Sequence, residues 1–416
     1  MDKKRLSLII GFIVITLLLG YALYWVFFKK PTPPTITGST LTPSSQKGGN
    51  FPSIGEGGPA PTTISDTKLP ISNDQTTSEG TQPITQFVQP TKTSFTYDTI
   101  TTVTEAPVKG ITASAGTAKF YNTQDGKFYR LDPNSGPTPL SDQVFYNVQE
   151  VTWSPQKNES IIQYPDGSKI FYNFDTKQQV TLPKHWEDFS FAPVGGQIAT
   201  KSVGLDPNNR WLITANTDGT GIRLIEPLGE NADKVNVDWS PNKQVVALSN
   251  TGEPLGDDRQ QVLMVGLNKE NFRGLVVEGR GLQTQWSKQG TKLLHSVYSA
   301  NSDFKPELWI VDATPNSVGA NRKPLNLNTW ASKCAMSDDR FVYCGVPEQL
   351  DTGSGFAPAL ANTTPDKLYK IDTNTGLKTE IPLGQQHTID TITIGEDGHT
   401  LYFTDKTEAG MFKVTI

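Results

Sequence analysis

The feature that most constrains this chain is a phrase that recurs from about residue 110 to the C-terminus. Each copy is an alternating apolar strand that ends in an aromatic or apolar residue, here called the marker residue, then a small polar turn and a second apolar strand. Two clear copies are VTWSPQKNESIIQY around Trp153 and VDWSPNKQVVALS around Trp239. The marker residues lie 38 to 58 residues apart, at positions 115, 153, 191, 239, 286, 336 and 394. Recurrence of this kind is typical of a repeat architecture.

A second phrase follows each copy of the first: an alternating strand, a polar turn and another short strand, as in KIFYNFDTKQQVTL. The two phrases together predict four short strands per unit, with Gly, Asn, Asp and Pro at the turns. Four strands at this period favour an all-β fold, a β-propeller over residues 96–416, because each blade buries its faces only against its neighbours. We expect seven blades, with six and eight as alternatives. Residues 98–108 are expected to supply the fourth strand of the last blade and close the ring.

The Trp-Ser-Pro motifs and strands such as KLYKIDTNTG resemble the WD40-like, TolB-type propeller repeats of bacterial envelope proteins. The resemblance covers most of residues 110–416, although the Asp-Gly usual after Trp-Ser-Pro is replaced in most copies. It implies the propeller architecture and an envelope setting. The aromatic marker residues Trp153, Trp239 and Trp286 recur at one strand position, which favours a packing role between blades over a ligand-stacking one.

An apolar segment precedes the repeat. Residues 6–28 are 23 uncharged positions, enough to span a hydrocarbon core of ~30 Å, and predict a transmembrane helix used as a signal anchor. Residues 1–5 include Lys3, Lys4 and Arg5, a bias that predicts a cytoplasmic tip and an extracytoplasmic C-terminal domain. The alternative is a cleaved signal peptide, whose apolar region is shorter and ends in a small-residue cleavage site.

Residues 29–95 differ from both neighbouring segments. Ser, Thr, Pro and Gly supply 39 of the 65 residues from 31 to 95, and only seven residues there are charged. Such a segment buries too little apolar surface to offset its chain entropy. We expect a disordered linker, a stalk that holds the propeller clear of the membrane.

The charge and the cysteine count exclude several classes of function. The formal charge is −5, so no basic face indicates nucleic-acid binding. Two cysteines are too few for a zinc ribbon. Cys334 and Cys344 flank a tight hairpin at equal distance from Asp339, which predicts a disulfide in an extracytoplasmic domain; a reduced, buried pair is the alternative.

No motif in the sequence indicates a catalytic, metal or cofactor site. The four histidines are scattered without metal-binding spacing, and no nucleophile elbow is present. Asp372–Gly376 imitates the start of a calcium loop but lacks its distal glutamate, so it is interpreted as a turn. A glycosidase pair of carboxylates stays open, because its members would come from different blades.

Extra length is concentrated between the second and third strands of the central blades. The insertions are roughly residues 201–210, 250–260, 298–306 and 345–366, and in a propeller such loops emerge on one face. Neutral drift in exposed loops is the alternative explanation. The candidate partner-binding residues in these loops are Asp257, Asp258, Arg259, Phe304, Leu350 and Phe356.

The sequence therefore favours a single-pass cell-membrane protein whose extracytoplasmic propeller binds an envelope protein or a glycan, without a cofactor. One alternative is a glycosidase-like propeller enzyme that acts on cell-wall or exported glycan. Another is a structural spacer without a ligand of its own.

Overall fold

The structure is a computed structural model that describes residues 17–19, 21, 100–132, 136–256, 258–270 and 272–416. The chain divides into two units, Met1–Phe87 and Val88–Ile416, and the fold described below is that of the second. No helix in the described part of the chain is long and apolar enough to cross a membrane. Apart from Leu17–Leu19 and Tyr21, the predicted span (residues 6–28) and the predicted stalk (residues 29–95) lie outside the described residues.

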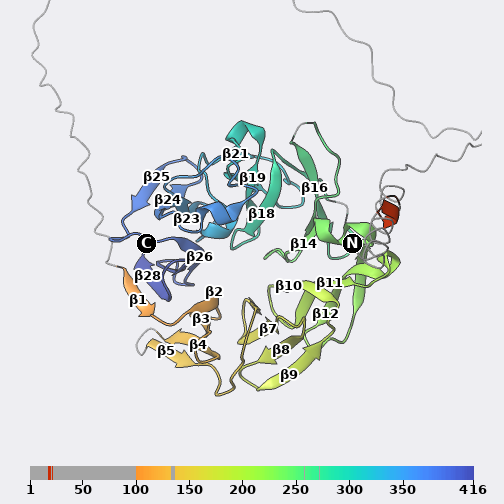
Figure 1. Ribbon diagram of the computed structural model, residues 1–416, viewed down its shortest axis with the longest axis horizontal. Helices are drawn as coiled ribbons and strands as arrows, with labels where there is room; N and C mark the ends of the chain where they lie inside the picture. Colours follow the sequence, from red (N-terminus) through yellow and green to blue (C-terminus); the bar gives the residue numbers. More distant parts are fainter. Residues whose placement is uncertain (1–16, 20, 22–99, 133–135, 257, 271) are drawn as a thin grey trace, which may run out of the picture. The chain divides into compact units, whose positions relative to one another are not determined.

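Seven antiparallel four-stranded sheets form a ring, which confirms the predicted seven-bladed propeller (Figure 1). The first strand of each blade lies nearest the middle of the ring and the fourth at the rim. Blade 1 contains β2 (Val108–Ser114), β3 (Thr117–Asn122), β4 (Lys127–Asp132) and β5 (Gly136–Pro139). Blade 2 contains β6 (Glu150–Trp153), β7 (Glu159–Gln163), β8 (Lys169–Asn173) and β9 (Gln178–Leu182). Blade 3 contains β10 (Trp186–Phe191), β11 (Gln197–Val203), β12 (Arg210–Asn216) and β13 (Arg223–Pro227). Blade 4 contains β14 (Val235–Val237), β15 (Val245–Ser249), β16 (Gln260–Gly266) and β17 (Leu275–Val277). Blade 5 contains β18 (Arg280–Trp286), β19 (Lys292–Tyr298), β20 (Glu307–Asp312) and β21 (Lys323–Pro324). Blade 6 contains β22 (Cys334–Met336), β23 (Phe341–Pro347), β24 (Asp366–Asp372) and β25 (Lys378–Ile381).

Blade 7 combines the two ends of the propeller sequence. It contains β26 (Ile389–Ile394), β27 (Thr400–Asp405) and β28 (Met411–Thr415), and its rim strand is β1 (Thr101–Thr104). β1 pairs antiparallel with β28, with Thr102 opposite Phe412. The expectation that residues 98–108 close the ring is therefore confirmed, and no edge of β28 is left open for another chain.

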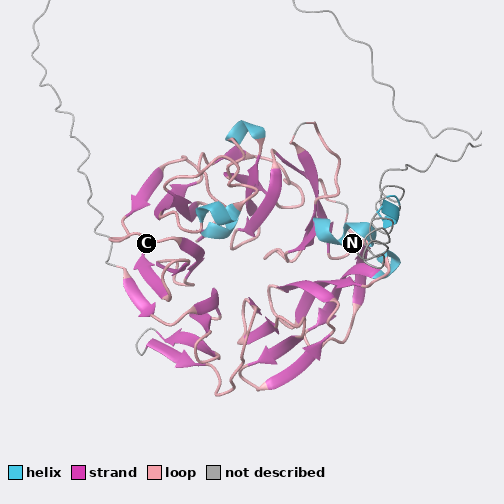
Figure 2. Ribbon diagram, viewed as in Figure 1, coloured by secondary structure: helices cyan, strands magenta, loops and turns pink. Residues whose placement is uncertain are grey.

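Short 3-10 helices lie in the connections between the strands (Figure 2). They are η1 (Pro207–Asn209), η2 (Gly229–Lys234), η3 (Ala300–Ser302), η4 (Ala331–Lys333) and η5 (Pro358–Ala361).

The core consists of separate clusters, one at each junction between neighbouring blades. Alternation places the side chains of each strand on both faces of its blade, and each face packs on the next blade. Phe191, Trp239 and Trp286, three of the marker residues, are buried in these clusters, and for Trp239 and Trp286 this is the packing role that was predicted. Trp153 lies across a junction, where its Nε1 donates to the Gly110 carbonyl of blade 1 at 2.6 Å.

Candidate functional site

The antiparallel order of strands decides which connections share a face of the ring. The first strand of a blade runs to one face and the second returns from it, so second-to-third loops and blade-to-blade connections share the opposite face. We call that side the loop face, and the side of the first-to-second turns the turn face. As predicted, the loop face carries the long loops of blades 3 to 6, which are residues 204–209, 250–259, 299–306 and 348–365.

The long loops of blades 5 and 6 are packed together. Gly353 N donates to the Asp303 carbonyl at 3.0 Å, and Gly355 N donates to the Phe304 carbonyl at 2.8 Å. The ring of Phe356 meets the ring of Phe304 edge to face, with 6.1 Å between their centroids. These contacts bring together Phe304 and Phe356, two predicted site residues that are 52 positions apart in the sequence.

Close packing of the two loops depends on a glycine. A Cβ on Gly355 would lie 2.4 Å from the Cβ of Tyr298 and 2.7 Å from the Phe304 carbonyl oxygen. The Tyr298 ring in turn meets the Phe356 ring at 5.9 Å. The loop of blade 6 is therefore fixed on blade 5 at the point where Phe356 projects.

The loop of blade 4 is held by ion pairs. Asp258 Oδ1 lies 2.8 Å from Arg280 Nη2, and its Oδ2 accepts a hydrogen bond from Ala300 N at 3.2 Å. Arg259 Nε pairs with Glu278 Oε2 at 2.9 Å. Asp258 thus connects blades 4 and 5, and Arg259 pairs with the residue that follows β17. The charges of both residues are therefore already partly matched within the chain. The predicted residue Asp257 lies outside the described residues.

The loop face leaves apolar side chains exposed among acids. Phe356 is 61% exposed and Leu360 54%, whereas the predicted residue Leu350 is half-buried. An exposed phenylalanine that a rigid loop holds in place is typical of a contact residue in a protein interface. The exposed acids of the long loops are Asp206, Glu253, Asp303, Glu348 and Asp351.

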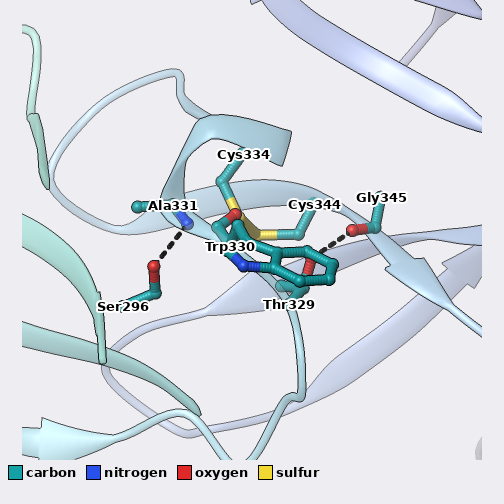
Figure 3. The surroundings of a disulfide bond; sticks show 7 residues. All are labelled: Ser296, Thr329, Trp330, Ala331, Cys334, Cys344 and Gly345. Atoms are coloured by element: carbon teal, nitrogen blue, oxygen red, sulfur yellow. Dashed lines mark hydrogen bonds between the residues drawn. A yellow bond between two sulfur atoms is a disulfide. The ribbon is translucent and has the colours of Figure 1, made fainter. Parts of the chain in front are cut away.

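The two cysteines lie opposite each other on adjacent strands of blade 6. Cys334 of β22 faces Cys344 of β23, with their Cα atoms 4.1 Å apart and their sulfurs joined in a disulfide (Figure 3). Thr329 Oγ1 donates to the Gly345 carbonyl at 2.6 Å, and Ala331 N donates to Ser296 Oγ at 3.0 Å. The disulfide therefore lies in a buried, hydrogen-bonded junction between blades 5 and 6.

The channel has a cavity of about 530 Å³ at the turn face, and every blade contributes to its lining. Marker residues such as Trp153 and Trp286 form part of its wall. Residues from the seven blades include Ala113, Thr152, Ser190, Trp239, Gln285, Ala335 and Ile392.

Two carboxylates at neighbouring inner strands interact electrostatically, a pair that the sequence analysis left unassigned. Asp188 has φ 58°, accepts a hydrogen bond from Val237 N at 2.8 Å and lies 3.3 Å from Lys201 Nζ. Burial, together with the charge of Asp188, raises the pKa of Asp238 to about 7, although hydrogen bonding from Thr284 opposes this shift. The sequence contains one local indication of this pair, the acid Asp238 directly before the marker residue Trp239.

One group in the described part of the chain has the composition of a metal site: His387, Asp405 and Glu408. His387 Nδ1 lies 3.0 Å from Asp405 Oδ2, which also accepts from Thr388 N at 2.8 Å. Asp405 Oδ1 accepts from the backbone of Thr407 and Glu408. Hydrogen bonds therefore account for the placement of this cluster, and it gives no independent indication of a metal.

No protein-family model matches this sequence, and no curated protein matches it. Oligogalacturonate lyase in complex with manganese matches with TM-score 0.53 and 14% identity, over 77% of this chain and 96% of the other. The β-propeller domain of Myceliophteria thermophila Cps50 (Swd1) also has TM-score 0.53, with 10% identity over 77% of this chain and 99% of that domain.

TolB from Acinetobacter baumannii is also among the matched structures, with TM-score 0.43 and 12% identity over 68% of this chain and 64% of TolB. The loose resemblance to WD40-like, TolB-type propeller repeats is confirmed at the level of the fold, a propeller of seven four-stranded blades that also matches the Cps50 (Swd1) domain. Similarity at these identities indicates a shared fold and carries no activity over to this chain.

Proposed function

We propose that this protein is a membrane-anchored, extracytoplasmic binding module, and that its loop face contacts a protein or a glycan of the cell envelope. The observation that carries the proposal is the packing of the long loops. Phe304 and Phe356 meet there across two blades, and Phe356 stays 61% exposed on a backbone fixed by hydrogen bonds. A preorganised apolar anchor with a polar rim reduces the entropy lost on binding.

The anchoring part of the proposal rests on the sequence. The uncharged residues 6–28 are long enough to span a bilayer, and the cations of residues 1–5 favour a cytoplasmic N-terminus. The Ser/Thr/Pro/Gly-rich residues 29–95 supply a spacer between such an anchor and the propeller. A disulfide between Cys334 and Cys344 suits an oxidising compartment.

Site-specific photo-crosslinking tests the binding role. A photoreactive amino acid replaces Phe356 in the full chain, in its own cells, and Leu377 is replaced in a matched control. Leu377 is 65% exposed and lies in the turn between β24 and β25, on the turn face. We expect a discrete crosslinked adduct from position 356 and none from position 377. Equal labelling from both positions, or none from either, would favour the spacer alternative.

A glycosidase-like enzyme is the second candidate, and one observation favours it. Asp188 of β10 and Asp238, directly after β14, interact electrostatically, and the pKa of Asp238 is raised to about 7. Glycosidases use two carboxylates, one of which stays protonated near neutral pH to act as the acid. If this candidate is correct, the protein releases reducing ends from a cell-wall or exported glycan, and Asp238→Asn lowers that rate by at least about a hundredfold.

A further inference from the structure

A second pocket opens on the loop face, away from the long loops. Its volume is about 690 Å³, and it lies between the connection from blade 1 to blade 2 and the turn between β7 and β8. Tyr146 and Asn147 come from the connection, Tyr164 and Pro165 from the turn, and Lys109 from the start of β2. Three segments that are distant in the sequence therefore meet around one opening.

One part of the pocket lining is a tight turn closed by hydrogen bonds. Gly167 N donates to the Tyr164 carbonyl at 3.0 Å, and Tyr164 N donates to the Ser168 carbonyl at 2.9 Å, which closes a tight turn with Pro165 inside it. Asp166 accepts hydrogen bonds from Ser168 N at 2.9 Å and Ser168 Oγ at 2.5 Å. The turn is thus held by its own hydrogen bonds, independently of anything that enters the pocket.

One aromatic ring at the pocket is exposed to solvent and not packed in the core. Tyr146 is 72% exposed, more than any other aromatic residue described in the propeller. Tyr164 lies half-buried against the core between blades 1 and 2, and its burial raises the pKa of its hydroxyl. Neither tyrosine hydroxyl has a hydrogen-bond partner among the described residues. Both hydroxyls are therefore free to donate and accept hydrogen bonds.

The remaining polar groups are mostly uncharged. The side-chain amides of Asn147 and Gln149 have no hydrogen-bond partner within the described part of the chain. Lys109 Nζ donates to the Val148 carbonyl at 3.3 Å. Hydrogen bonds from Ser168 lower the pKa of Asp166 to about 2, with a smaller contribution from Lys184 at 3.4 Å, so this carboxylate is already satisfied. The groups left for a ligand are two hydroxyls, two amides and one ammonium.

We propose that this pocket is a carbohydrate-binding subsite in which the exposed face of Tyr146 stacks on a sugar ring. A sugar offers an apolar C–H face to an aromatic ring and a rim of hydroxyls to amides, tyrosine hydroxyls and an ammonium, and these are the groups that line the pocket. The charged groups at the pocket are one ammonium, Lys109, and one carboxylate, Asp166, whose hydrogen bonds are already made. Because a single cation beside a carboxylate attracts a polyanion only weakly, the pocket favours a neutral glycan. The inference deepens the proposed binding role of the loop face and rests on it.

Co-sedimentation of the full chain, solubilised in detergent, tests the subsite. The probes are insoluble cellulose, chitin, mannan and peptidoglycan sacculi, and soluble oligosaccharides of the retained polymer serve as competitors. We expect retention on at least one probe. Tyr146→Ala should weaken retention about tenfold, because the stacking face is lost, while Tyr146→Phe should keep most of it. Leu377→Ala, an equally exposed change on the turn face, should have no effect.

Two results would overturn the inference: no retention on any of the four probes, or equal retention of wild type and Tyr146→Ala. A third variant, Phe356→Ser, shows whether a failure of the subsite is also a failure of the proposed binding role of the long loops. If Phe356→Ser abolishes retention and Tyr146→Ala does not, the long loops bind the glycan and the pocket does not. If the probes fail while position 356 still yields a crosslinked adduct, the binding role stands without this subsite.

Discussion

Some charged side chains are buried at the blade junctions, where each needs a partner of opposite charge. Lys333, at the end of η4, directs its Nζ at both carboxylate oxygens of Asp366, at 2.8 and 2.7 Å, and the Asp366 side chain is fully buried. Ile389 N donates to the same carboxylate at 2.7 Å, so one ion pair connects blades 6 and 7. Taking charges out of water is costly, and the pair persists because each charge has its partner.

Lys333→Met is therefore expected to lower the free energy of unfolding by about 3–5 kcal/mol, because it leaves Asp366 buried and unpaired. Urea denaturation at neutral pH measures the effect. The matched control is the neighbouring pair of Lys367 and Glu380, 3.5 Å apart with both side chains nearly half exposed. Lys367→Met should cost less than about 1 kcal/mol. Similar losses in both variants would contradict the burial argument.

Asp238 gives a residue-scale prediction about pH. Its folded-state pKa of about 7 lies above its ordinary value of 3.8, so the folded protein holds this proton more tightly than the unfolded chain does. The stability that this provides is complete below about pH 4 and is lost as the pH rises through about 7.

We expect Asp238→Asn to gain stability relative to wild type between about pH 4.5 and about pH 8, as measured by denaturant unfolding at both values. The gain should be on the order of 2 kcal/mol, less than full linkage gives, because Asp238 is only partly buried. Parallel pH dependences of the two proteins would show that Asp238 does not titrate in this range.

At the scale of elements, the closing strand β1 is the most consequential piece. It is the only strand of blade 7 that comes from the N-terminal side of the propeller, and it covers the edge of β28. Val103 of β1 also packs in the cluster between blades 1 and 7. Without β1, the edge of β28 would be open to another chain.

Two truncations test this role. A chain that begins at residue 98 keeps β1 (Thr101–Thr104), and a chain that begins at residue 106 lacks it. We expect the shorter chain to lose about 2–5 kcal/mol of unfolding free energy through its missing hydrogen bonds, and to aggregate in size-exclusion chromatography. Equal stability of the two chains would mean that β1 does not close the ring.

The elements were the part of the structure that the sequence predicted best. Strand positions follow from period-2 alternation and turn residues, which are local, so each marker residue lies at or just after the end of a first strand. The placement of long loops between second and third strands followed from the same repeat. What could not be predicted were contacts between blades, such as Ile389 with Asp366 or Phe304 with Phe356, because they depend on how distant segments meet in three dimensions. The Tyr146 pocket, built from three such segments, was missed for the same reason.

At the scale of the whole molecule, the proposed topology predicts the result of protease shaving on intact cells. The Ser/Thr/Pro/Gly-rich residues 29–95 should be cut, and a resistant C-terminal fragment of residues from about 96 to 416 should be released. Blotting for the C-terminus detects the released fragment, and protease treatment of lysed cells provides the control.

A domain that resists cleavage until the cells are lysed would place the propeller in the cytoplasm or behind an outer membrane. Releasing the outer membrane alone separates these two cases. Alkylation in denaturant gives an independent measure: the buried Cys334 and Cys344 should react with a maleimide only after reduction. Reaction without reductant would argue against the outward topology.

Closure of the ring by β1 also determines where the propeller would yield to a pulling force. Residue 100 leads directly into β1, so tension between the N-terminal segment and a partner held on the loop face reaches this strand first. Its ladder to β28 contains three residue pairs. Every other blade is built from consecutive strands and has no such seam. Under load we expect the ring to part between β1 and β28, so the seam that closes the propeller is also its mechanical weak point.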